Sequence, residues 1–546
     1  MSSIINSAMS GLSAAQAALS TTSNNISNYT VAGYSRQTIL LNQANSTLSG
    51  NSYYGNGVNV TGVQREYDEF ITAQLRGSSA NYSAVNTQYN QISNIDDLLS
   101  TSTTSLSTSI QSFFTNVSNV VSNADDPSAR QSMLSYAQGL VNQFQTTAQY
   151  LTNMQNSVNT DVSSSVDQIN TYTSQIADLN TQIAKLTTAG SAPNDLLDKR
   201  DQLVNNLNNI VGVSVSQQDG SYIVTMGSTT LVNGKNTTQL VAMPSSSDPS
   251  RTTVGYVDKT AGNVEIPEKT LTTGSLGGLL AFRTQDLDTA QNQLGQLAAA
   301  FTTSFNAVQT TGYDSNGDLG SKFFNIGSPT VLSNTKNTST AEVTAEWSDS
   351  SALKASNYSM SYDSASSTWS VTRMSDNVKF SVTPDATDGT LSFDGLKLTV
   401  TGTPDNKDSF LVKPVQNVIS GMSVAITDAS QIAAASSATS GESDNTNAQK
   451  MLALQDTNLV NGNATLAQAY ATIVSTVGNK TSSLETASTT QENVVTQLTD
   501  RQQSVSGVNL DEEYANLTKY QQFYMANAQV LQTASTIFNA LMDIRG

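Results

Sequence analysis

The sequence of 546 residues contains no cysteine and no histidine. Without cysteine there are no disulfides, no thiolate nucleophiles and no cysteine-ligated metals, and the redox compartment is left undecided. Without histidine the chain lacks the commonest metal ligand and the side chain best suited to proton transfer near neutral pH. Most catalytic arrangements are thereby excluded, so we expect no catalytic residues, no cofactor and no metal site.

Charge is also scarce. Charged residues make up 12% of the chain, against about 25% in typical globular domains. The 25 Lys and Arg residues and 43 Asp and Glu residues give a formal net charge of −18, which repels phosphate backbones and anionic membranes. We therefore expect neither nucleic acid nor a membrane as a partner. A neutral polar surface suits an exported protein that packs beside its own copies.

Long apolar runs are missing as well. The first twenty residues lack a basic start, an unbroken apolar stretch and a cleavage site, and nowhere do about 20 apolar residues run together. The sequence thus predicts no cleaved signal peptide and no membrane span. Its length suggests three or four domains, at roughly 150 residues each.

Both ends of the chain carry apolar residues at alternating spacings of three and four, which predict a coiled-coil-like helix at each end. The N-terminal seam consists of Ile5, Ala8, Leu12, Ala15, Leu19, Thr22 and Ile26. The C-terminal seam consists of Leu510, Tyr514, Leu517, Tyr524, Ala528, Leu531, Phe538 and Met542, with polar Gln521 and Ser535 at two positions. A second stripe on the C-terminal helix consists of Phe523, Val530, Ile537, Leu541 and Ile544. One partner helix covers only one of these two stripes.

The C-terminal helix has a marked start. Asn509 is the expected N-cap, and Asp511, Glu512 and Glu513 stand in the first turn, where carboxylates meet the positive end of the helix dipole. Glu512, three residues after the cap, is placed to complete a capping box. A structural role for this acidic triplet is favoured over acid–base chemistry, because it has no histidine or metal partner.

Helical and strand periodicities alternate along the middle of the chain. Residues from about 65 to 210 read mainly as long helices, and from Val211 the period changes to two around the turn dipeptide Asp219-Gly220. Helical periodicity resumes after Gly274. A second β-rich region covers about 340–420, and helices return from about 446.

These patterns predict an α+β multi-domain fold, namely a discontinuous α-helical rod built from both chain ends, with two β-rich inserted domains and terminal coiled-coil-like helices. The expected parts are terminal helices at 1–34 and 509–546, a rod of 35–210, 274–335 and 425–508, a small β domain at 211–273 and a second at 336–424. We expect the terminal helices to be mobile in the monomer, since isolated helices with exposed seams are marginal in water.

Three groups of residues resemble functional sites but are better explained structurally. The segment from Asp314 to Asp318 starts like a calcium loop, yet Leu319 stands where glycine is required and Asn325 where a bidentate glutamate is required. A polar turn is favoured there. The glycines at 274, 277 and 278 match no nucleotide-binding pattern and indicate close packing or a turn. The helix expected at 196–207, LLDKRDQLVNNL, carries Asp198, Arg200 and Asp201, which indicate a solvated charged face.

Two terminal stretches resemble the axial-protein family of the bacterial flagellum, which comprises rod, hook and hook-associated proteins. Residues 23–37, SNNISNYTVAGYSRQ, match the family's N-terminal motif through Asn24, Asn25, Gly33, Tyr34 and Arg36. Residues 506–545 match its C-terminal stretch. Further segments, including PNDLLDKRDQLV and EIPEKTLTTGSLGGLLAFRTQDLD, resemble the hook-associated branch, so that the likeness covers most of the chain.

This resemblance implies a structural, non-enzymatic subunit of the ring that joins hook and filament, needed for filament assembly and motility. It implies export by the flagellar type III apparatus without a cleaved signal peptide, and an extracellular place on the flagellum. The implied partners are copies of the chain itself, the hook protein, a second hook-associated junction protein, and a cytoplasmic export chaperone at the C-terminal helix. Another flagellar axial protein, or a secreted adhesin-like binding protein, is the alternative interpretation.

The heptad seams supply a mechanism for such assembly. We expect the two terminal helices to pair, antiparallel or parallel, and the spare apolar stripe to pack against neighbouring subunits. The residues predicted for the assembly interface are Ile5, Leu12, Leu19, Ile26, Leu517, Tyr524, Leu531, Phe538 and Leu541.

Overall fold

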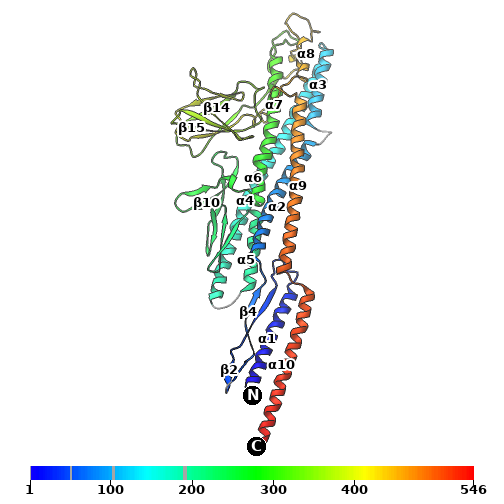
Figure 1. Ribbon diagram of the computed structural model, residues 1–546. Helices are drawn as coiled ribbons and strands as arrows, with labels where there is room; N and C mark the ends of the chain where they lie inside the picture. Colours follow the sequence, from blue (N-terminus) through cyan, green and yellow to red (C-terminus); the bar gives the residue numbers. More distant parts are fainter. Residues whose placement is uncertain (1, 50–51, 101–104, 189–192, 546) are drawn as a thin grey trace. The chain divides into compact units, whose positions relative to one another are not determined.

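The computed structural model describes residues 2–49, 52–100, 105–188 and 193–545 (Figure 1). The chain divides into two compact units. The terminal unit contains both chain ends and comprises residues 1–83, 168–239 and 489–546, whereas the central unit comprises residues 84–167 and 240–488. Helices at both termini and β-rich regions in the middle confirm the predicted α+β fold. The finer division into four parts stays a prediction.

The terminal unit combines the two end helices with a β ribbon, a small sheet and parts of three long helices. Its elements are α1 Ser2–Ser27, β1 Gln37–Gln43, β2 Thr47–Ser49, β3 Ser52–Tyr54, β4 Val58–Arg65, the first part of α2 Glu69–Ser100, the last part of α4 Pro127–Thr188, α5 Asn194–Ile210, β5 Ser214–Gln218, β6 Ser221–Met226, β7 Thr229–Asn233, β8 Asn236–Thr237, the end of α9 Leu466–Ser506, and α10 Leu510–Arg545. Strands β5 to β8 form an antiparallel meander in chain order. The predicted turn at Asp219 and Gly220 is confirmed, because both residues have the positive φ that a two-residue hairpin requires.

The central unit contains the remaining parts of α2, α4 and α9 together with two β regions, one at 240–265 and one at 324–424. Its other elements are α3 Leu106–Ser122, β9 Leu240–Pro244, β10 Thr252–Asp258, β11 Gly262–Glu265, the 3-10 turn η1 Glu268–Thr270, α6 Gly274–Ala281, the π-helical segment η2 Phe282–Leu287, α7 Asp288–Gln309, β12 Phe324–Asn325, β13 Thr330–Ser333, β14 Glu342–Trp347, β15 Tyr358–Asp363, β16 Thr368–Arg373, β17 Val378–Val382, β18 Leu391–Phe393, β19 Leu396–Thr401, β20 Ser409–Lys413, β21 Ser423–Val424, the 3-10 turn η3 Ala429–Gln431, and α8 Thr446–Ala453. The range predicted as an insert, 336–424, supplies all but one strand of a five-stranded sheet, β13-β20-β15-β16-β17, and the whole of a three-stranded sheet, β14-β19-β18; strand β13 lies before that range.

The ribbon at 37–65 was not predicted, because this segment was assigned to the helical rod. Strands β1 and β4 pair antiparallel over their whole length, with a bulge between Leu40 and Leu41, and β2 pairs with β3 farther out. A short period-two signal was present in Val58 and Val60. The ribbon lies against α1, where the Ser10 hydroxyl accepts a hydrogen bond from the Val58 backbone N–H at 3.2 Å.

An aromatic cluster forms the core of the central unit. Phe113 of α3 contacts Phe301 and Phe305 of α7, with ring centroids 5.5 and 5.4 Å apart, and all three rings are buried. The glycine at 278 has the close packing that its sequence suggested: a Cβ there would lie 2.2 Å from the carbonyl oxygen of Ala84 on α2. A larger residue at this position would force α6 and α2 apart.

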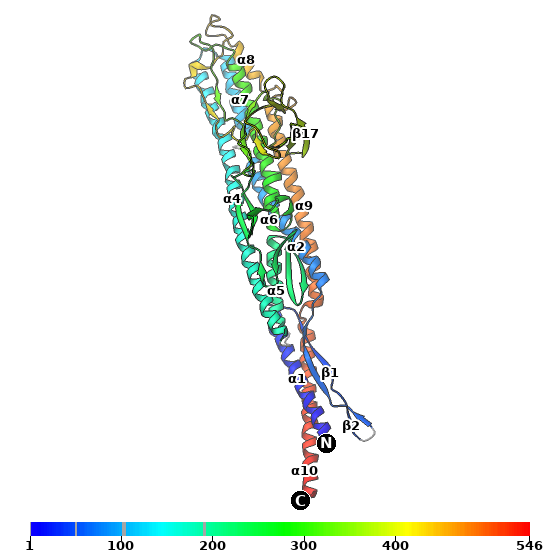
Figure 2. The ribbon, with the colours of Figure 1, turned by 90° about the vertical axis from the view of Figure 1, so that its left-hand side faces the viewer.

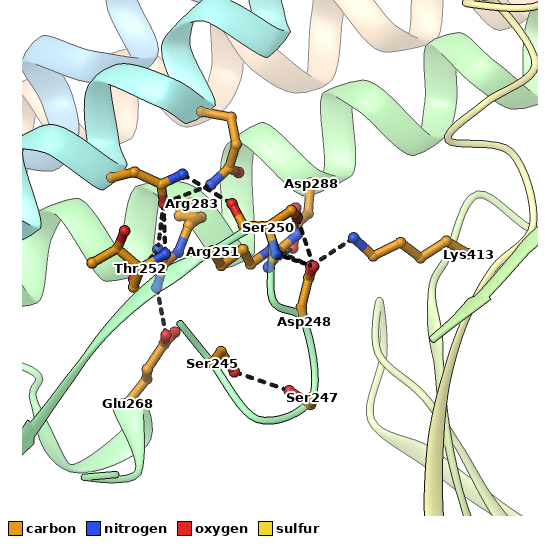
Figure 3. A network of polar contacts seen from close by, with 12 residues as sticks. Ser245, Ser247, Asp248, Ser250, Arg251, Thr252, Glu268, Arg283, Asp288 and Lys413 are labelled. Atoms are coloured by element: carbon orange, nitrogen blue, oxygen red, sulfur yellow. Dashed lines mark hydrogen bonds and ion pairs between the residues drawn. The ribbon is translucent and has the colours of Figure 1, made fainter. Parts of the chain in front are cut away.

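A buried network of charges joins the two β regions of the central unit to its helices (Figure 3). Lys413 at the end of β20 donates to Asp248 at 2.6 Å, and Asp248 also binds Arg251 at 2.9 Å. Arg251 reaches Asp288 at the start of α7 at 2.5 Å, while Arg283 on the π-helical segment binds Glu268. Burial and the nearby Arg251 cation lower the pKa of Lys413.

This network yields a stability prediction for the central unit. Asp248→Ala removes the carboxylate that Lys413 binds and leaves a buried ammonium group beside Arg251, a loss that we expect to cost about 3–5 kcal/mol. Tryptophan fluorescence during urea unfolding measures it, because both tryptophans, Trp347 and Trp369, lie in the adjoining β region.

The matched control is Asp376→Ala, which removes an exposed partner of Arg373 and should cost less than about 1 kcal/mol. Asp248→Leu combined with Lys413→Met should recover most of the loss, since it replaces the pair by apolar groups. An unchanged urea midpoint in Asp248→Ala would show that the network contributes little.

Candidate assembly site on the terminal helices

Helices α1 and α10 lie side by side in the terminal unit (Figures 1 and 2). Gly11 of α1 faces Asn527 of α10 so closely that a Cβ at Gly11 would lie 2.4 Å from the Asn527 side chain. At the other end of the pair, Asn25 of α1 contacts Glu513 of α10. The later residue of α1 thus contacts the earlier residue of α10, so the two helices are antiparallel. This is one of the two arrangements that the heptads allowed.

The contact face of α1 consists of small side chains. Ala8, Ala15, Ala18 and Thr22 are buried, together with the closely packed Gly11. The larger predicted interface residues of this helix flank that face and are half-buried: they are Ile5, Leu12, Leu19 and Ile26. The small members of the predicted seam, Ala8, Ala15 and Thr22, share this face with Gly11 and Ala18, which the predicted seam did not include.

On α10 the predicted interface residues differ in exposure. Leu517 and Leu531 are half-buried, whereas Tyr524, Phe538 and Leu541 are exposed. The C-terminal end of α10 extends past the start of α1, so that the last turns have no α1 residue opposite them (Figures 1 and 2). The large apolar side chains that α10 leaves exposed from residue 523 onward are Phe523, Tyr524, Met525, Val530, Ile537, Phe538, Leu541, Met542 and Ile544.

Asn25 of the family motif is the centre of a buried polar cluster. Its side-chain oxygen accepts hydrogen bonds from the Tyr34 hydroxyl at 2.7 Å and from the Gln37 backbone N–H at 3.0 Å. Its amide nitrogen donates to the Gln37 carbonyl at 2.8 Å and to a carboxylate oxygen of Glu513 at 3.2 Å. Asn25 is 1% exposed. One side chain thus joins α1, the connecting loop, β1 and α10.

Arg36 ties the same cluster to the first turn of α10. Its Nε donates to Glu513 at 2.8 Å and its Nη1 to Glu512 at 2.8 Å. Its backbone N–H donates to the carbonyl of Ser506 at the end of α9. Asn509 caps α10 as predicted, by accepting from the backbone N–H of Asp511. The prediction that Glu512 completes a capping box was wrong, because its carboxylate binds Arg36 instead.

The loop between α1 and β1 is held in place by its own motif residues. Gly33 has a φ of +83°, and a Cβ there would lie 2.7 Å from the Gln202 side chain. The backbone N–H and hydroxyl of Ser35 both donate to Asp198 of α5, at 3.1 and 2.8 Å. Burial, with the negative charges of Asp198 and Glu513, raises the pKa of Tyr34 to about 12. Asn24 lies at the edge of the cluster, where its amide donates to the Tyr34 hydroxyl at 3.3 Å.

The prediction of a solvated charge face on α5 was wrong. Asp198, Arg200 and Asp201 are buried. Arg65 at the end of β4 binds Asp198 at 2.9 Å and Asp201 at 2.7 Å. The Arg200 guanidinium lies 3.5 Å from the ring centroid of Tyr222 on β6. Tertiary contacts with the ribbon and the meander cover this face, and helical periodicity alone carries no sign of them.

The sequence interpretation also missed the role of Glu513, which it treated only as part of a helix start. The sequence did indicate that Arg36 needs a carboxylate partner. Arg36 is the one charged residue among the first 64 positions, so a carboxylate partner elsewhere was to be expected if that cation became buried.

The calcium-like segment forms a polar turn, in which a carboxylate oxygen of Asp314 accepts from the backbone N–H groups of Asn316 and Asp318. Within the described residues, no cluster of three or more acidic side chains could hold a metal ion. In the same part of the chain, no helix combines the length and apolar character needed to cross a membrane.

Four family models match successive parts of the chain. The model of the flagellar hook-associated protein FlgK helical domain matches residues 92–324, and that of the flagellar hook-associated protein 1 D2-like domain matches residues 332–414. The model of the flagella basal body rod protein matches residues 5–34, and that of the flagellar basal body rod FlgEFG protein C-terminal matches residues 501–544. The last two matches include most of α1 and most of α10, respectively.

Known proteins are similar over the full length. The flagellar hook-associated proteins 1 of Escherichia coli K12 and Salmonella typhimurium LT2 are 57% and 58% identical, with 100% of each chain covered. The solved structure of the flagellar hook junction protein FlgK from Burkholderia pseudomallei is 30% identical with a TM-score of 0.76, and it covers 80% of this chain and 100% of its own. The chain therefore belongs to the flagellar hook-associated protein 1 family.

Proposed function

We propose that this chain is a structural subunit of the bacterial flagellum that forms the junction between hook and filament. The names of its full-length relatives support this place in the flagellum. The chain would join copies of itself into a ring between the hook protein and a second hook-associated junction protein. It would reach the cell exterior through the flagellar export apparatus without a cleaved signal peptide.

The observation that carries the proposal is the exposed apolar end of α10. Ile537, Phe538, Leu541 and Met542 are each about half exposed, and Ile544 is 83% exposed. Apolar surface in contact with water is costly, and large exposed patches mark contact surfaces. No α1 residue lies opposite this end, so contacts with sister molecules are the natural way to bury it.

The distribution of charge supports the same use. Residues 1–64 carry one charged side chain, Arg36, and residues 514–542 carry one, Lys519. A chain with a net charge of −18 repels its own copies unless the contacting surfaces are nearly free of charge. Helix α1 and residues 514–542 of α10 meet that condition, and Asp543 and Arg545 stand at the C-terminal end of α10.

An uncovered apolar helix end would also associate too early in the cytoplasm. We infer that an export chaperone covers the C-terminal helix before secretion, in the manner of an amphipathic helix laid in a groove. Chaperone binding and ring formation would then use the same side chains at different times.

A strain that lacks the gene tests the junction role. We expect hooks of normal length without filaments, flagellin shed into the medium, and loss of swimming, because filament subunits would have no ring on which to polymerise. Electron microscopy of the cells and immunoblotting of the culture supernatant measure this. Normal filaments in the deletion strain would rule out the junction function.

The apolar end of α10 gives a second prediction. Phe538→Asp combined with Leu541→Asp should abolish both chaperone binding and filament formation, because the carboxylates would have to be desolvated in either complex. Pull-down of the chaperone and swimming assays measure the two effects. Phe70→Asp is the matched control, since Phe70 is an exposed phenylalanine at the start of α2, 66% accessible. Retention of both activities in the double variant would show that this end is not the contact surface.

Amide hydrogen exchange on the free protein tests the expected mobility of the chain ends. We expect residues 3–28 and 510–544 to exchange much faster than α3 and α7, because a two-helix pair with exposed seams opens easily whereas the phenylalanine cluster does not. Equal protection of the chain ends and the cluster helices would contradict the expectation.

A further inference from the structure

The seam between α1 and α10 specifies their alignment only weakly. The α1 side consists of small residues, Ala8, Gly11, Ala15, Ala18 and Thr22, whose spacing repeats with the heptad. A slide of one heptad, about 10 Å along the axis, therefore brings similar side chains into contact again. Helix α1, Ser2–Ser27, contains no charged residue that could favour one alignment.

The length of the connection between α1 and β1 does not by itself select an alignment. Nine residues, 28–36, link the end of α1 to β1. Extended backbone spans about 3.3 Å per residue, so this loop has enough length to absorb a slide of about 10 Å. The ribbon contact at Ser10 and Val58 attaches β4 to α1, so a slide of α1 would have to move the ribbon or break this contact, in which α10 takes no part.

The polar cluster where α1 ends and α10 begins does favour one alignment of the two helices. Glu513 is 2% exposed, and it binds both Asn25 and Arg36. After a slide of one heptad Asn25 could no longer reach Glu513, and Arg36 could follow it only by leaving Ser506. A buried carboxylate that loses its partners is strongly disfavoured, and a buried polar contact in an otherwise apolar seam is a well-attested means of setting helix register.

We propose that Asn25, Arg36 and Glu513 act as a register clamp, which selects the alignment with Gly11 opposite Asn527. The clamp thereby sets how many turns of α10 extend past α1 and remain available for sister molecules. The register is a property of the single chain, whereas its use in ring assembly rests on the proposed function. These three side chains are positioning residues, because they act through the helix end that they place.

Disulfide trapping in the purified full-length chain measures the register directly, because the natural sequence contains no cysteine. Gly11→Cys is combined in turn with Asn527→Cys, for the native alignment, and with Tyr520→Cys or Ala534→Cys, for slides of one heptad in either direction. A disulfide needs Cα atoms within about 7 Å, so each pair reports one alignment. With the clamp intact, we expect the 11–527 disulfide to exceed the other two by at least about tenfold.

Removing the clamp should equalise the three yields. In Glu513→Leu with Asn25→Ala, an apolar side chain that fits any alignment replaces the carboxylate, and the shifted disulfides should rise to within about threefold of the native one. Glu512→Gln is the matched control: Glu512 is the exposed partner of Arg36, so the 11–527 disulfide should stay dominant.

Two outcomes would overturn the proposal. One is a dominant 11–527 disulfide in Glu513→Leu with Asn25→Ala, and the other is loss of all three disulfides, which would make the cluster necessary for pairing itself. Disulfide formation is measured in the purified protein and tests the register clamp alone. The deletion strain tests the junction role separately, so the failure of one proposal can be told from the failure of the other.

Discussion

The terminal unit depends on one buried carboxylate, Glu513, held between Asn25 of α1 and Arg36 of the connecting loop. A charge removed from water is tolerated only when it is paired and hydrogen-bonded, so these partners must stay where they are. Ser35 fastens the same loop to Asp198, and Arg65 fastens Asp198 to the ribbon. The placement of α10 beside α1 therefore follows from a few polar contacts at one end of the pair.

The apolar part of the helix pair plays a different role. Small residues on α1 allow the two helices to approach closely, while the larger side chains of α10 are only partly covered. Within one chain this leaves a helix end that favours association over solubility. The proposed ring would bury such an end between sister molecules. The absence of charged residues from α1, and the single charge, Lys519, between residues 514 and 542 of α10, lower the electrostatic obstacle to that burial.

The central unit also places few charged residues in its core. Its phenylalanine cluster excludes water without polar groups, whereas the β regions are joined to the helices through Asp248, Arg251 and Lys413. In both units, buried charges lie where separate elements meet. Such contacts contribute little net stability against apolar alternatives, but they penalise every wrong arrangement of the elements they connect.

The sequence by itself determined the terminal helices, the helical stretch ending at 210, the turn at Asp219 and the start of helix at Gly274, because these depend on local periodicity, capping and backbone preference. It also pointed to Asn25, Tyr34 and Arg36 through the family motif. Only the tertiary structure decided that Asp198 and Asp201 are buried, that 37–65 folds back as a ribbon, and that Glu513 meets Arg36 across 477 positions. Contacts between distant segments depend on which faces are brought together in space, and periodicity along one segment carries no information about that.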